Sequence, residues 1–89
     1  MLKERIYYEQ LYELLLYSKD KQTIWETNGY KTLKESLENL AEYIEENKNE
    51  QFYFEIRFVK NYVIKCGKDK ETENLENKLV ISGYTKKLK

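Results

Sequence analysis

The sequence predicts an α+β fold: two helices packed on one face of a three- to four-stranded antiparallel sheet, in the order α-(β)-α-β-β-β. Two segments, residues 2–17 and the stretch that follows Thr32, repeat apolar side chains at the period of an amphipathic helix. Residues 52–58 alternate apolar and polar side chains, as a half-buried strand does. Elements with one apolar face bury it against each other, which predicts two layers.

Residues 2–17 form the first predicted helix. With about 100° between successive residues, an arc of about 160° collects most of its apolar and aromatic side chains. These are Tyr7, Tyr8, Leu11, Tyr12, Leu14 and Leu15. The arc is wider than the ~100° stripe of an ordinary surface helix. We therefore expect this helix to lie between two elements or to offer part of its face, with Tyr8 and Tyr12, to a partner.

Residues 23–27 read as a short strand or an extended connector, followed by the turn signal Asn28-Gly29. Because only two residues separate this turn from the next helix, the sequence argues against a full hairpin here. Trp25 and Tyr30 flank the turn, and large aromatic side chains are common anchors of protein interfaces. Both are therefore candidate contact residues.

The second predicted helix begins at Thr32, which lies three residues before Glu35 in the spacing of a capping box. Its apolar side chains follow at helical spacing: Leu33, Leu37, Leu40, Ala41 and Ile44. Glutamates occupy the remaining faces, where they solvate the helix or present an acidic ridge to a basic partner. Polar residues 47–50 end the helix.

The C-terminal half predicts the sheet. A three-residue loop at residues 59–61 would pair Phe58 with Tyr62 and keep one face apolar on both strands. Residues 67–77 are expected to form a charged connection, and residues 78–85 a last strand. The sheet face opposite the Phe row carries Tyr53, Glu55 and Arg57, and we expect it to meet solvent or a partner.

Length and composition predict one small domain spanning residues 1–89, with a frayed basic tail at 86–89. A single cysteine, Cys66, cannot form an intramolecular disulfide. The N-terminal residues lack a signal-peptide pattern, and no apolar run approaches the ~20 residues that span a bilayer. The sequence therefore predicts a cytoplasmic protein with no membrane segment.

The chain has nine tyrosines and no histidine. Histidine is the usual general base and metal ligand near neutral pH. One cysteine cannot build a zinc site, and Cys66 has no histidine to activate it. The glutamates follow a solvent-facing pattern, whereas acid–base catalysis needs a carboxyl group with a pKa raised by burial. We therefore expect no catalytic residues, no cofactor and no metal, and a protein that is not an enzyme.

The remaining features favour a protein-binding module. The candidate contact residues are Tyr8, Tyr12, Trp25, Tyr30, Tyr53 and Arg57. Small size and a composition that follows AT-rich codons fit a phage or mobile-element accessory protein that inhibits or modulates a larger host protein. The expected partner is that host protein or a second copy of the chain.

The alternative is a nucleic-acid-binding module. The exposed sheet face would offer Tyr53 for base stacking and Arg57 for phosphate, and the C-terminal lysines would add charge. Two observations weigh against it. Acidic and basic residues balance at 16 each, so no net charge attracts a polyanion, and Glu55 lies within the proposed contact row.

Overall fold

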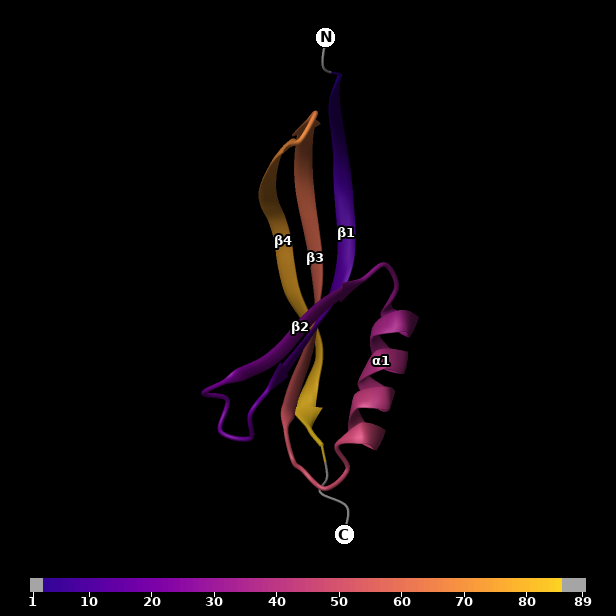
Figure 1. Ribbon diagram of the computed structural model, residues 1–89, viewed down its shortest axis with the longest axis vertical. Helices are drawn as coiled ribbons and strands as arrows, with labels where there is room; N and C mark the ends of the chain where they lie inside the picture. Colours follow the sequence, from indigo (N-terminus) through magenta and orange to yellow (C-terminus); the bar gives the residue numbers. More distant parts are fainter. Residues whose placement is uncertain (1–2, 86–89) are drawn as a thin grey trace.

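The computed structural model describes residues 3–85 and shows one α-helix and four strands in the order β-β-α-β-β (Figure 1). The elements are β1 (Glu4–Tyr17), β2 (Ile24–Tyr30), α1 (Leu33–Glu46), β3 (Tyr53–Cys66) and β4 (Asp69–Tyr84). All neighbouring strands are antiparallel, and the sheet order is β2-β1-β3-β4. The expected tail at 86–89 lies outside the described residues.

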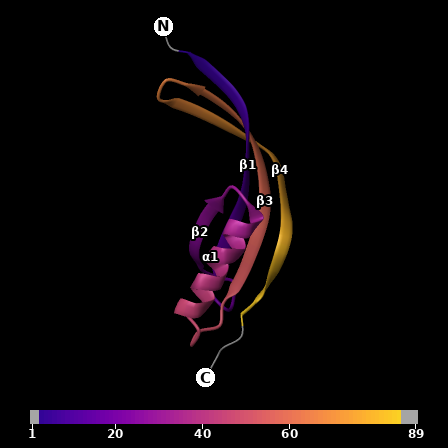
Figure 2. The same cartoon turned by 90° about the vertical axis from the view of Figure 1, so that its right-hand side faces the viewer.

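The sheet is much longer than the helix, and the molecule measures 60 × 21 × 20 Å. β2 pairs only with residues 12–17 of β1, and α1 lies over the same end of the sheet (Figures 1 and 2). We call this end the helix-covered half. The distal half consists of residues 4–11, 59–66 and 69–77, and no helix within residues 3–85 covers it.

The hydrophobic core lies between α1 and one sheet face, which we call the helix-side face. Five side chains are buried there: Leu14, Leu16, Leu40, Phe52 and Ile56. Half-buried residues surround them: Tyr12, Tyr30, Leu33, Tyr43, Ile44 and Phe54. Full burial of one large apolar side chain contributes about 1.5–3 kcal/mol, so this single cluster holds the two layers together.

The helix begins where the sequence predicts. The Thr32 hydroxyl accepts a hydrogen bond from the Glu35 N–H (3.2 Å), which satisfies one of the free donors of the first turn. Ser36 is fully buried, and its hydroxyl donates to the Tyr12 carbonyl (3.0 Å), tying the first turns of α1 to β1. The predicted stripe is only partly buried, since Leu37 remains 41% exposed.

The predicted fold class is wrong at its first element, because residues 4–17 form strand β1 and not a helix. β1 lies in the interior of the sheet, between β2 and β3. Leu14 and Leu16 are buried on the face toward α1, and Leu11 and Leu15 are half-buried on the opposite face, so strict alternation disappears. The wide apolar arc of the supposed helix is the sum of these two faces. Tyrosine is also common in strands.

Three connections differ from expectation. Residues 59–61 form no loop, because β3 runs unbroken through them. Most of the expected charged connection at 67–77 belongs to β4, and the turn is confined to Gly67 and Lys68, with Gly67 in the left-handed region (φ 60°). Asn28-Gly29 makes no turn, because it lies inside β2, and the hairpin at that point is absent as expected. β2 instead forms a hairpin with β1 through the turn at residues 18–23.

A polar contact joins α1 to β2. The Tyr43 hydroxyl donates to the Glu26 carboxylate, and the Asn28 amide donates to the same carboxylate (2.8 Å). Both hydrogen bonds, and chiefly the one from Tyr43, hold the pKa of Glu26 below its ordinary value. The same bond is the main cause that raises the pKa of Tyr43. The contact therefore needs an ionised carboxylate and a neutral phenol.

The pH dependence of stability should report this contact. The folded pKa of Glu26 is lowered, so its contribution is present above the ordinary glutamate pKa and lost as the pH falls through the lowered value. The folded pKa of Tyr43 is raised, so its contribution is lost only as the pH rises through that raised value. Urea unfolding across the pH range should show that acid lowers the free energy of unfolding less in Tyr43→Phe than in the wild type. Parallel acid profiles would contradict this, and Glu45→Gln serves as the exposed control.

Candidate functional site

The distal half presents exposed apolar side chains on the helix-side face. Because β1 and β3 pair without a register shift, Ile6 lies opposite Ile64 and Tyr8 opposite Tyr62, on the same face as Leu14. The Tyr8 and Tyr62 ring centres are 5.7 Å apart. Ile6 is 55% exposed and Tyr8 62% exposed. We call Ile6, Tyr8, Tyr62 and Ile64 the distal patch.

Carboxylates border the distal patch along β4 and at its outer end. Two adjoining hollows share Ile64 and Glu71; Tyr62 and Glu73 line one of them, and Glu4, Cys66 and Asp69 the other. The Lys60 ammonium lies 5.0 Å from the centre of the Tyr8 ring, on the side toward the core. The patch is therefore apolar at its centre and negative along β4 and at its outer end.

The opposite face of the distal half is better packed, although no helix of the described chain covers it. Val63 is fully buried and Val59 is 5% exposed. They lie opposite Tyr7 and Leu11 in the sheet register, and both of these side chains are half-buried. The two faces of the distal half thus differ, and the large side chains of β1 that are left open to solvent, Ile6 and Tyr8, lie on the helix-side face.

A row of three tyrosines crosses the open face of the helix-covered half. Tyr17, Tyr53 and Tyr84 come from three adjacent strands, with ring centres 5.7 Å and 5.1 Å apart. The Lys21 ammonium lies 4.3 Å from the Tyr53 ring centre and 5.5 Å from that of Tyr84. Lys21 adopts a left-handed backbone (φ 64°) in the β1–β2 turn, which is unfavourable for a residue other than glycine.

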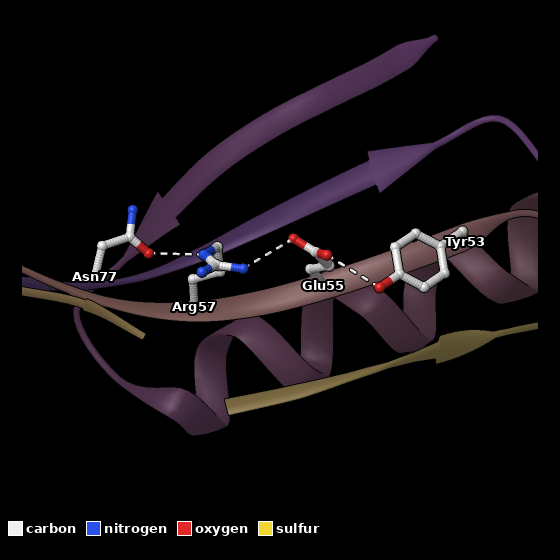
Figure 3. Close-up of polar contacts among 4 residues, drawn as sticks. All are labelled: Tyr53, Glu55, Arg57 and Asn77. Atoms are coloured by element: carbon white, nitrogen blue, oxygen red, sulfur yellow. Dashed lines mark hydrogen bonds and ion pairs between the residues drawn. The ribbon is translucent and has the colours of Figure 1, made fainter. Parts of the chain in front are cut away.

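Arg57 belongs to a chain of polar contacts on the same face (Figure 3). Its guanidinium donates to the Asn77 side-chain oxygen (2.7 Å) and to the Glu55 carboxylate (3.2 Å). Glu55 also accepts a hydrogen bond from the Tyr53 hydroxyl (3.0 Å). Arg57 and Glu55 are both largely buried at their side chains, so the positive charge is neutralised within the protein.

The predicted contact residues do not form one site. Tyr8 lies in the distal patch, whereas Tyr53 and Arg57 lie on the open face of the other half. Tyr12 and Tyr30 pack against the core cluster. Trp25 is 41% exposed, and the centre of its ring lies 5.7 Å from the centre of the buried Phe52 ring.

Sequence reasoning missed the partners of these residues: Ile6, Tyr62 and Ile64 in the patch, and Tyr17 and Tyr84 in the tyrosine row. Ile6 and Tyr8 are two positions apart and therefore share one face of a strand, and this spacing would have been the signal for the patch.

Among the described residues, no group of three or more acidic or sulfur ligands is placed to hold a metal ion, and no helix is long and apolar enough to cross a membrane. Two groups of aromatic and apolar side chains lie at the surface of the described residues: the distal patch and the tyrosine row. Comparison with protein-family models, with curated proteins and with solved structures finds no match to this chain.

Proposed function

We propose that this chain is a non-enzymatic protein-binding module and that the distal patch is its contact surface. The observation that carries the proposal is the pair of cross-strand contacts, Ile6 with Ile64 and Tyr8 with Tyr62, on a face that the helix leaves open. Exposed apolar side chains that adjoin one another mark contact sites more often than scattered ones do.

The composition of the patch supports protein binding. Tyrosine supplies a large contact area with a polar tip and is enriched at interfaces. The Tyr8 and Tyr62 rings already pack against each other in the free protein, so these side chains lose little conformational entropy on binding. That the partner is a larger host protein, bound by a phage or mobile-element accessory, stays a prediction from composition.

Charge separates this proposal from nucleic-acid binding. Glu4, Asp69, Glu71 and Glu73 would repel phosphate at the distal patch. The tyrosine row, with Lys21 above it, is the one arrangement here that favours the second candidate, because aromatic rows on open sheet faces stack bases. Arg57 adds little to it, since its charge is already paired with Glu55.

Two isoleucines of equal exposure give a matched test. Ile6 is 55% exposed in the distal patch, and Ile24 is 56% exposed at the other end of the molecule. The tagged chain would capture its partner from the native host, and the affinity of that partner would be measured for Ile6→Ser and Ile24→Ser. We expect Ile6→Ser to weaken binding at least about tenfold, equivalent to ~1.4 kcal/mol, and Ile24→Ser to have little effect.

Equal affinities of Ile6→Ser and the wild type would refute the distal patch as the contact surface. Binding of DNA or RNA that falls steeply with added salt, and that is lost in a Lys21→Glu variant, would support the second candidate instead.

A further inference from the structure

The outer edge of β4 is the longest unpaired edge of the sheet. β4 has 16 residues, and within residues 3–85 its only neighbour is β3. Four large apolar side chains on it are exposed by more than two fifths: Leu75, Leu79, Val80 and Ile81. Unpaired edges of this kind are templates for pairing with another strand unless the sequence prevents it.

The middle of β4 is self-complementary. Residues 75–79 read Leu-Glu-Asn-Lys-Leu. If two copies of this segment run antiparallel about a two-fold axis at Asn77, Glu76 of each copy faces Lys78 of the other. Leu75 of each copy then faces Leu79 of the other. A two-fold interface repeats every contact twice, so one sequence supplies both halves of a charge and apolar match.

The structure places these side chains suitably. The Glu76 carboxylate and the Lys78 ammonium are 2.9 Å apart, and their register with Lys60 and Phe58 puts both on the helix-side face. Leu75 and Leu79 are each 48% exposed. A second Glu–Lys pair beside the first would form an alternating square of charges, in which each charge has two opposite neighbours.

One irregularity lies at the first residue of the segment, Leu75, and another directly after the segment, at Val80. The β3–β4 register shifts between Lys60 and Asn61 and between Ile56 and Arg57, which leaves Leu75 and Val80 without partners on β3. Between these bulges, residues 76–79 pair regularly. Bulges bend a strand and interrupt pairing, so they would confine added pairing to a short segment and oppose open-ended growth of the sheet.

We propose that two copies of this chain pair through β4, antiparallel and centred on Asn77, so that their two sheets become one. The helix does not obstruct this arrangement, because α1 contacts β1 and β2, which lie toward the opposite edge of the sheet from β4. The β4 edge is also separate from the distal patch, so this proposal stands whether or not the patch binds a partner.

Charge reversal tests the pairing. Sedimentation equilibrium should give twice the mass of one chain for the wild type at high concentration. Lys78→Glu places four carboxylates together and should give a single-chain mass at the same concentration. The double variant Glu76→Lys with Lys78→Glu restores the match and should restore the doubled mass. The control is Lys34→Glu, which reverses the charge of an exposed lysine that forms an ion pair with Glu38 on α1. This variant should keep the doubled mass.

Cross-linking tests the register. In a Cys66→Ser background, Asn77→Cys places two thiols opposite each other on neighbouring strands, at a separation that permits a disulfide. Mild oxidation should link it into a dimer on a non-reducing gel. Thr72→Cys lies on the same strand but faces position 82 of the other copy, so it should link far less. A single-chain mass of the wild type at every concentration, or equal cross-linking of both variants, would overturn the proposal.

Discussion

Ile56→Ala is expected to lower the free energy of unfolding by about 2–4 kcal/mol, whereas Ile6→Ala should lower it by less than about 1 kcal/mol. Both isoleucines lie on the helix-side face of the sheet. Ile56 is fully buried beneath α1, so its truncation leaves a cavity in the core. Ile6 is 55% exposed, so its truncation mainly removes side-chain area that is already in contact with water.

Urea unfolding followed by circular dichroism would measure both changes. The denaturant dependence of the unfolding free energy should stay the same in the two variants, which would show that the same surface is exposed in each case. A loss in Ile6→Ala as large as that in Ile56→Ala would mean that Ile6 is buried in solution. In that case the distal patch would already be occupied, and its role as an open contact surface would need another explanation.

How far the sequence predicts this fold depends on whether local or long-range interactions decide each element. Helix α1 is predicted well because Thr32, Glu35 and the following leucines are a local signal. β1 is decided by long-range contacts, since Leu14 and Leu16 are buried against α1 and the strand pairs with both β2 and β3. β4 is obscured for the opposite reason: near Glu71 and Glu73 the strand is exposed, so polar residues hide the alternation.

The candidate site follows the same division. Tyr8 and Tyr53 are recognisable from the sequence because they are large aromatics; in the structure Tyr8 is exposed and Tyr53 is half-buried. Their neighbours are not, because Tyr62 reaches Tyr8 and Tyr84 reaches Tyr53 only through the strand register. The complementarity of residues 75–79 becomes visible only once they form one edge strand, whereas the sequence analysis divides them between a charged connection that ends at residue 77 and a strand that begins at residue 78.

Thr85 directly follows β4 and is hydrogen-bonded to Phe52, and Thr85→Val should lower the free energy of unfolding by about 1–3 kcal/mol. Its N–H donates to the Phe52 carbonyl (2.9 Å), and its hydroxyl accepts from the Phe52 N–H (3.0 Å). Phe52 is fully buried and Thr85 is 6% exposed, so no water replaces a lost partner. Valine keeps the branched shape of threonine but leaves the Phe52 N–H buried without an acceptor.

Thr85→Ser is the matched variant, because it keeps the hydroxyl and removes only the methyl group. Urea unfolding should place Thr85→Ser close to the wild type and Thr85→Val well below it. The reverse order would show that the methyl group, through packing, stabilises this position. If the predicted order is observed, the hydrogen bonds between Thr85 and Phe52 fix the start of β3 beside the end of β4. Phe52 then lies under Trp25 and Tyr43 because the backbone on both sides of it is held.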